Sequence, residues 1–91
     1  MSFFVYILFS LKDKKLYVGH TDNLEKRLKD HNGGKVKSTE RRKPLILLYD
    51  EKFSTRSLAA RREKFLKSLY GARFKQKLVK DYLKNKKEIL K

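Results

Sequence analysis

The chain opens with an unbroken apolar run at residues 3–9, rich in aromatic and branched side chains, which favours a strand buried on both faces. A polar break and a second apolar stretch at residues 16–21 follow so closely that an antiparallel hairpin is predicted. With an even loop of four residues, the pleat places Tyr6, Tyr17 and Gly19 on one face of the sheet.

A helix of about nine residues is predicted after this hairpin. It begins near Asp22, which together with Glu25 resembles a capping box, and it ends at Gly33 or Gly34. The stripe expected to face inward consists of Leu24, Arg27, Leu28 and His31. A polar and strongly basic loop without an apolar period follows at residues 33–44.

The rest of the chain is expected to form one strand, at residues 45–53, and two helices. Thr55 or Ser57 caps the first of these helices, which runs to about residue 70, and Gly71 separates it from the second, which runs from residue 72 to about residue 84. The predicted apolar stripes are Leu58, Phe65, Leu66 and Leu69 in one helix and Phe74, Leu78, Val79 and Tyr82 in the other.

The order β-β-α-β-α-α predicts an α+β fold, a small three-stranded antiparallel sheet flanked by three helices. We expect residues 1–91 to make one domain, with a core at about residues 3–84 and a frayed basic tail at residues 85–91. Cysteine is absent, so neither a disulfide nor a thiolate zinc site can stabilise the fold. Without a signal-peptide pattern or a membrane span, a cytoplasmic location is expected.

The net charge of the chain predicts a polyanionic partner. The chain has 25 lysines and arginines against 10 acidic residues, a net charge of +15 at pH 7, which predicts nucleic-acid binding. Residues 35–43 hold five cations and one glutamate, which indicates phosphate contacts, although a solvated basic loop has the same composition. The candidate nucleic-acid contacts are Lys35, Lys37, Arg41, Arg42 and Lys43 in this loop and Arg62 and Lys67 in the second predicted helix.

Two phenols are the first candidate catalytic groups. Tyr6 and Tyr17 lie on one face of adjacent predicted strands, so they could converge on one site, although tyrosine is also an ordinary strand residue. Gly19 favours the functional interpretation, because a glycine inside a strand usually makes room for a bulge or for a closely approaching group.

The first predicted helix brings a cation and an imidazole to the same side. Arg27 and His31 are four residues apart and stack beside Leu24 and Leu28. Arg27 could grip a phosphate with two hydrogen bonds, a geometry that lysine cannot reproduce. Equally, Arg27 could extend past the leucines to solvent, and His31 could be a helix-end residue favoured by the helix dipole.

Glu63 is the single carboxylate between Glu51 and Asp81, in a segment rich in lysine and arginine. An acid in such a segment is often an ion-pair partner. At helical spacing, Glu63 lies between Ala59 and Leu66, on the border of the buried stripe. There it could instead hold a hard cation with several waters left in place.

These residues together resemble a known family. The segments VYI at residues 5–7, YVG at residues 17–19 and NLEKRLKDH at residues 23–31 are similar to the motifs of the GIY-YIG nuclease superfamily. The chain looks most like the small stand-alone bacterial members, which resemble the N-terminal endonuclease domain of bacterial excinuclease C. Phe4 stands where the first motif has glycine, and Val18 stands where the second has isoleucine.

The resemblance implies a role for each candidate residue. The family's catalytic positions are matched by Tyr6, Tyr17, Gly19, Arg27, His31 and His20. Glu63 matches the single metal-binding glutamate, and the implied cofactor is one Mg²⁺ or Mn²⁺ ion. The implied fold is the same three-stranded antiparallel sheet flanked by helices.

Three functions are consistent with these residues. The resemblance implies a metal-dependent endonuclease that hydrolyses phosphodiester bonds in DNA, structure-directed or weakly sequence-specific, in DNA repair or recombination. The alternative is a non-catalytic module that holds DNA or RNA with the same basic surface. A third hypothesis is a chain that acts only as a subunit in a repair complex, which an apolar patch on the outer face of the last helix would support. A protein partner could also supply sequence specificity.

Overall fold

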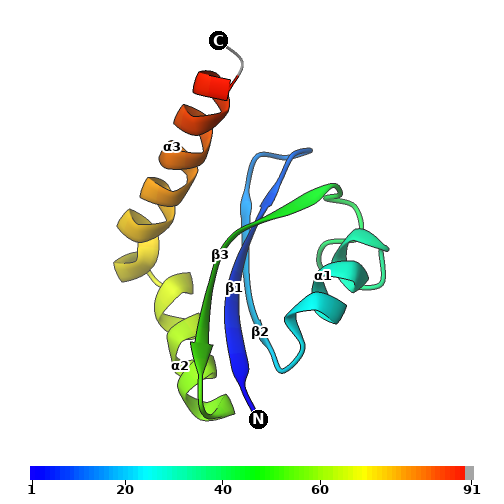
Figure 1. Ribbon diagram of the computed structural model, residues 1–91, viewed down its shortest axis with the longest axis vertical. Helices are drawn as coiled ribbons and strands as arrows, with labels where there is room; N and C mark the ends of the chain where they lie inside the picture. The colour runs from blue at the N-terminus through cyan, green and yellow to red at the C-terminus, as the bar shows by residue number, and fades with distance from the viewer. Residues whose placement is uncertain (90–91) are drawn as a thin grey trace.

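The central layer of the protein is a three-stranded antiparallel sheet with the strand order β2-β1-β3 (Figure 1). The computed structural model describes the backbone of residues 1–89 and the side-chain surroundings of residues 1–85. In chain order the elements are β1 (Phe3–Ser10), β2 (Leu16–Thr21), α1 (Leu24–Asn32), β3 (Leu45–Phe53), α2 (Arg56–Lys67), a 3₁₀ turn (Leu69–Gly71) and α3 (Ala72–Ile89). The predicted α+β class and element order are confirmed.

β1 is the central strand, and this position explains its unbroken apolar sequence. Residues 5–8 are fully buried, because other strands pair with both edges of β1 and helices cover both of its faces. The hairpin register pairs Tyr6 with Gly19 and Leu8 with Tyr17, as the four-residue loop predicts. The two tyrosines therefore lie on the same face of the sheet as Gly19.

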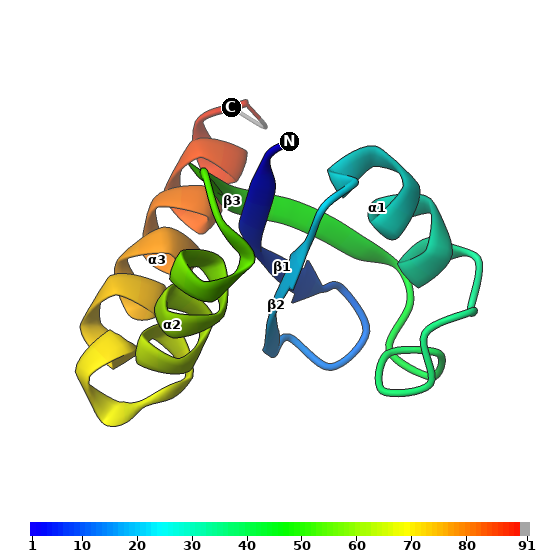
Figure 2. The ribbon, with the colours of Figure 1, turned by 90° about the horizontal axis from the view of Figure 1, so that it is seen from below.

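The sheet separates two apolar layers, with α1 on one face and α2 and α3 on the other (Figure 2). The layer under α1 consists of Tyr6, Leu8 and Leu45, with Tyr17, Leu24 and Leu28 packed against them. The opposite layer consists of Val5, Ile7, Val18, Ala59 and Leu66, with Phe74 and Leu78 among the side chains packed against them. Alternate residues of β1 thus supply both layers.

The predicted apolar stripe of α2 is wrong in part. Leu66 is fully buried against the sheet, whereas Leu58 and Phe65 are 42% and 43% exposed and Leu69 is 92% exposed. The helix ends before Leu69, because Ser68 adopts an extended conformation and residues 69–71 form a 3₁₀ turn. A Cβ at Gly71 would lie 2.6 Å from the Cα of Leu66, so glycine is required for this close approach.

The other helix boundaries follow local capping and helix propensity. Asn23, not Asp22, caps α1, because the Asn23 side chain accepts a hydrogen bond from a backbone N–H of the first turn. Thr55 caps α2 in the same way, as predicted. α3 runs to Ile89, beyond its predicted end, since no glycine or proline stops it there. Residues 90–91 of the predicted tail lie outside the described residues.

No helix within residues 1–89 combines the length and the apolar character needed to cross a bilayer.

The basic loop between α1 and β3 folds against the body of the protein. Val36 and Thr39 are buried, so two of its side chains join the interior. Arg42 forms an ion pair with Asp13 of the hairpin loop, with 2.6 Å between Nε and Oδ2. Ser10 Oγ donates a hydrogen bond to the carbonyl oxygen of Arg42 at 2.6 Å. The loop is therefore fixed at several points along its length.

Gly71→Ala is expected to lower the free energy of unfolding by about 1 to 3 kcal/mol, because the new methyl group has to displace backbone atoms rather than a flexible side chain. Urea unfolding followed by circular dichroism measures this change. The matched control is Leu69→Ala, whose side chain is 92% exposed and whose effect is expected to stay within about 0.5 kcal/mol. Equal stability of Gly71→Ala and the wild type would contradict the close packing of this turn.

Candidate active site

Tyr6 and His31 form a hydrogen bond between β1 and α1. Tyr6 Oη and His31 Nε2 are 2.9 Å apart, and both side chains are fully buried. Arg27 lies one turn earlier in α1, and its Nε–H donates to Tyr6 Oη at 3.4 Å. Of the orientations that the sequence leaves open, α1 therefore adopts the one that directs both Arg27 and His31 toward the sheet.

Gly19 makes room for this arrangement. It pairs with Tyr6 across the hairpin, and a Cβ at Gly19 would lie 2.6 Å from Tyr6 Oη and 3.1 Å from Cε1 of Tyr17. A side chain at this position would therefore displace the Tyr6 phenol from His31. The absence of a side chain at Gly19 thus allows Tyr6 to reach His31.

Tyr17 lies beside the buried pair and is the more accessible of the two phenols. Its ring meets the ring of His31 edge-to-face with centroids 4.9 Å apart, and its centroid lies 6.2 Å from that of Tyr6. Tyr17 is half-buried, whereas Tyr6 and His31 are fully buried. A molecule approaching from solvent can thus reach Tyr17 directly.

Burial sets the protonation states of Tyr6 and His31. Desolvation, with smaller contributions from Tyr17 and Glu63, raises the pKa of Tyr6 to about 12 against the lowering effect of the Arg27 hydrogen bond. Desolvation, together with the positive charge of Arg27, lowers the pKa of His31 to about 4. At pH 7 Tyr6 is therefore a neutral phenol and His31 is a neutral imidazole.

His20 and Glu63 form a second cluster, reached from the opposite face of β2. His20 Nδ1 lies 3.1 Å from Glu63 Oε1, and Lys67 Nζ donates to Glu63 Oε2 at 3.3 Å. The Glu63 side chain is 20% exposed, so its carboxylate is partly desolvated and still accessible. The predicted catalytic residues are thus divided, with His20 beside Glu63 and the other five on the α1 face.

The donor set around Glu63 fits a hard divalent cation. Within the described part of the chain, no three side chains of His, Cys, Asp or Glu gather at one point. Mg²⁺ needs no such cluster, because it is commonly bound through one or two carboxylates and substrate phosphates and keeps several waters. Glu63 supplies one carboxylate, and the hydrogen bond from His20 orients it.

The predicted nucleic-acid contacts divide into accessible and engaged side chains. The accessible ones are Lys35, Lys37, Arg41 and Lys43 on the basic loop and Lys67 beside Glu63. Arg42 is bound to Asp13, as described above. Arg62 Nε lies 3.2 Å from Oε1 of Glu51 in β3, and the two form an ion pair without a hydrogen bond. The Arg62 guanidinium also lies over the ring of Phe74. Arg42 and Arg62 are thus engaged in ion pairs within the fold.

Sequence reasoning missed two polar residues that support the site. The hydroxyl of Thr39 lies 2.7 Å from His31 Nδ1, and Thr39 is fully buried. The amide of Asn32 accepts from the backbone N–H of Leu45 at 2.9 Å and donates to its carbonyl oxygen at 3.0 Å, which joins the end of α1 to the start of β3. Thr39 lies in the basic loop, which has no apolar period, and Asn32 is exposed at the end of α1, so no local signal indicates either residue.

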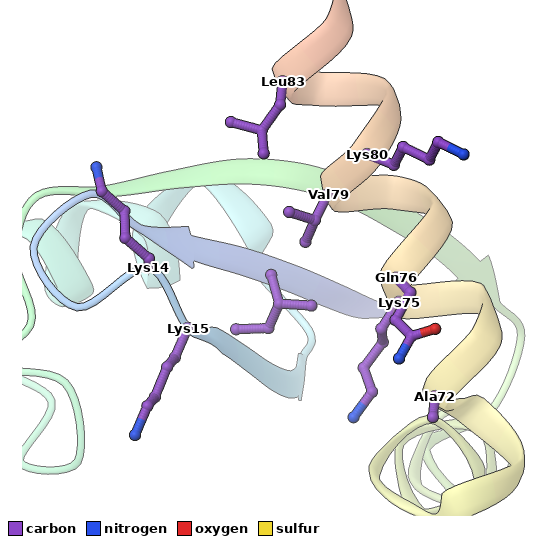
Figure 3. Close-up of a pocket in the computed structure, with 9 residues that line it drawn as sticks. Lys14, Lys15, Ala72, Lys75, Gln76, Val79, Lys80 and Leu83 are labelled. Carbon is purple, nitrogen blue, oxygen red and sulfur yellow. The ribbon is translucent and has the colours of Figure 1, made fainter.

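A hollow of about 650 Å³ lies between the hairpin and α3, apart from both clusters (Figure 3). Leu16, Val79 and Leu83 form apolar parts of its lining. The lysines that line it are Lys14, Lys15, Lys75 and Lys80. No predicted catalytic or metal-binding residue lines this hollow, so it extends the basic surface without being part of the site.

Comparison with known proteins decides the family. The sequence model of the GIY-YIG catalytic domain matches residues 2–78. The chain belongs to the GIY-YIG family. The match runs from β1 into α3, so it includes both clusters of the site.

Relatives of similar length match most of this chain. A UPF0213 protein of Staphylococcus haemolyticus is 42% identical over 79 residues, which cover 86% of this chain and 94% of the relative. A UPF0213 protein of Bacillus subtilis is 40% identical over 86 residues, 93% of this chain and 84% of the relative. The solution NMR structure of a UPF0213 protein from Bacillus halodurans has 36% identity and a TM-score of 0.51, and the alignment covers 88% of this chain and 84% of that one.

Acidification from pH 7 to pH 5 is expected to cost the fold about 2 kcal/mol through His31. Its pKa is about 4 when folded against 6.5 for an ordinary histidine, so the unfolded chain binds more protons and stability falls as the pH drops below 6.5. Urea unfolding at several pH values measures this loss. His20→Gln, which keeps His31, is expected to retain the loss, whereas His31→Gln is expected to reduce it; the same pH dependence in both variants would contradict the assignment.

Proposed function

We propose that this GIY-YIG protein is a metal-dependent endonuclease that hydrolyses phosphodiester bonds in DNA. The observation that supports it most is the placement of Arg27. The hydrogen bond to Tyr6 raises the pKa of Arg27, to which Tyr17 adds, so a permanent cation stands beside both phenols. Tyr17 lies on β2, an edge strand of the sheet. Glu63 of α2 contacts the same strand through His20.

Tyr17 is the proposed general base. Tyr6 keeps its proton, because its pKa is about 12, and His31 is completely buried. Tyr17 is left as the accessible phenol that can take a proton from an attacking water. Arg27 stays positively charged beside both phenols, so it stabilises the negative charge of the oxygen that takes this proton.

Arg27 is the proposed stabiliser of the transition state. Its guanidinium can donate two parallel hydrogen bonds to phosphate oxygens, and Tyr6 fixes its direction through Nε. Charge builds up on these oxygens as water attacks the phosphorus. Preorganised donors of this kind are often worth about 2.7 to 4 kcal/mol of barrier.

Glu63 is the proposed ligand of one Mg²⁺ or Mn²⁺ ion. Such an ion, when bound, neutralises phosphate charge and stabilises the leaving oxygen. His20 orients the carboxylate, and Lys67 balances its charge in the free protein. Lys67 Nζ lies 3.3 Å from Glu63 Oε2, so Lys67 would have to release this oxygen for it to hold a cation.

The accessible cations of the basic loop, between α1 and β3, are the proposed DNA contacts. Phosphate contacts hold a duplex in position but carry no sequence information. Because the proposed contacts are phosphate contacts, we propose that the enzyme responds to DNA structure or has weak sequence preference. We further propose a role in DNA repair or recombination.

Purified protein with Mg²⁺ or Mn²⁺ is expected to nick or cut supercoiled, branched or flapped DNA. Glu63→Gln and Arg27→Lys are each expected to slow cleavage by about 10²- to 10³-fold, because each removes a charge or a geometry that the transition state needs. Gel assays of single-turnover cleavage measure these rates. The matched control is Glu51→Gln, which removes a partly buried carboxylate from β3 and is expected to keep the wild-type rate.

Equal cleavage by the wild type and by both active-site variants would indicate a contaminating nuclease and refute the proposal. A wild type that binds DNA with steeply salt-dependent affinity and cuts none of these substrates would instead identify a non-catalytic binding module. Thermal unfolding of each variant separates loss of activity from loss of fold.

A further inference from the structure

Thr39 stands apart from the other polar residues of the basic loop, because it is fully buried. A buried hydroxyl is unfavourable unless it is hydrogen-bonded. Thr39 Oγ1 lies 2.7 Å from His31 Nδ1 and 3.4 Å from the carbonyl oxygen of Val36. His31 is thereby held at both ring nitrogens, by the loop on one side and by Tyr6 on the other.

The acceptors in this chain of contacts determine where the protons lie. The Val36 carbonyl can only accept, so the Thr39 hydroxyl donates to it and accepts from His31 Nδ1–H. His31 Nε2 then carries no proton and accepts from the Tyr6 hydroxyl. The opposite order would leave the buried Tyr6 hydroxyl proton without an acceptor among the contacts of the described residues, which is costly.

The direction of the Tyr6 proton fixes the direction of Arg27. When Tyr6 donates its proton to His31, a lone pair of Tyr6 Oη is left to accept a hydrogen bond. Arg27 Nε–H donates to it at 3.4 Å. If His31 carried its proton on Nε2, the phenol would have to turn its own proton toward the guanidinium. The position of one proton on His31 thus decides whether Arg27 is held.

We propose that Thr39 is a positioning residue of the active site, which fixes the tautomer of His31 and through Tyr6 aims Arg27. This inference rests on the proposed function and adds a link to the DNA contacts. Thr39 belongs to the same loop as Lys37 and Arg41, which are exposed. Thr39 therefore joins the loop that carries the proposed DNA contacts to the hydrogen-bond chain that ends at Arg27.

The tautomer of His31 tests the proposal in the free protein, without any cleavage. Thr39→Val replaces the hydroxyl by a methyl group of similar size, and Thr39→Ser, which keeps the hydroxyl, is the matched control. Side-chain ¹⁵N resonances are expected to place the His31 proton on Nδ1 in the wild type and in Thr39→Ser, and to lose this preference in Thr39→Val. A wild-type proton on Nε2, or unchanged resonances in Thr39→Val, would overturn the proposal. If Thr39→Val does not fold, Thr39→Ala removes the same hydroxyl without adding bulk.

Cleavage kinetics test the positioning role. Thr39→Val is expected to cut about 10- to 100-fold more slowly, the usual effect of removing a residue that orients a functional ligand, with unchanged Kd for DNA. Thr39→Ser is expected to restore the rate. A Thr39→Val variant that cuts as fast as the wild type would overturn the positioning role. A wild type that never cuts would refute the proposed function, while the resonances of His31 would still decide the tautomer.

Discussion

The hydrogen bond between Tyr6 and His31 is the contact on which the α1 side of the candidate site depends. It joins the central strand to α1 at a point from which water is excluded, so both groups are satisfied only by each other and by Arg27 and Thr39. Losing either partner would leave a buried polar atom unpaired, which typically costs about 1 to 3 kcal/mol. The geometry of the accessible residues, Tyr17 and Arg27, therefore depends on a pair that no substrate touches.

Acidic residues are scarce in this cationic chain, and several of the described ones fasten separate elements together. Arg42 lowers the pKa of Asp13 to about 2, and their ion pair joins the basic loop to the hairpin. Glu51 holds Arg62 between β3 and α2. A net charge of +15 opposes compaction through self-repulsion, so attractive contacts at these points offset part of that repulsion. Glu63 differs from these acids because its partners are the imidazole of His20 and the long, half-exposed side chain of a lysine.

The sequence predicts the sheet well, because the period of two in a strand is a local signal. It places Tyr6, Tyr17 and Gly19 on one face, and the register of the hairpin agrees. Side-chain partners are harder to predict. The burial of Thr39 depends on a histidine in the preceding helix, and the engagement of Arg42 depends on an acid in a distant turn. The exposure of Leu69 depends on the close packing of Gly71, and none of these contacts leaves a periodic trace in the sequence.

The alternation of β2 has a consequence for how the two clusters are held together. Tyr17 and Gly19 face one side of this edge strand, and the His20 side chain lies on the other. The backbone of β2 therefore separates the two phenols from the Glu63 carboxylate that contacts His20. A shift of one residue in the pairing of β2 would exchange these sides and empty both clusters at once. The hairpin loop contains no proposed catalytic group, but its length determines the register of β2. That register places Tyr17 in one cluster and His20 in the other.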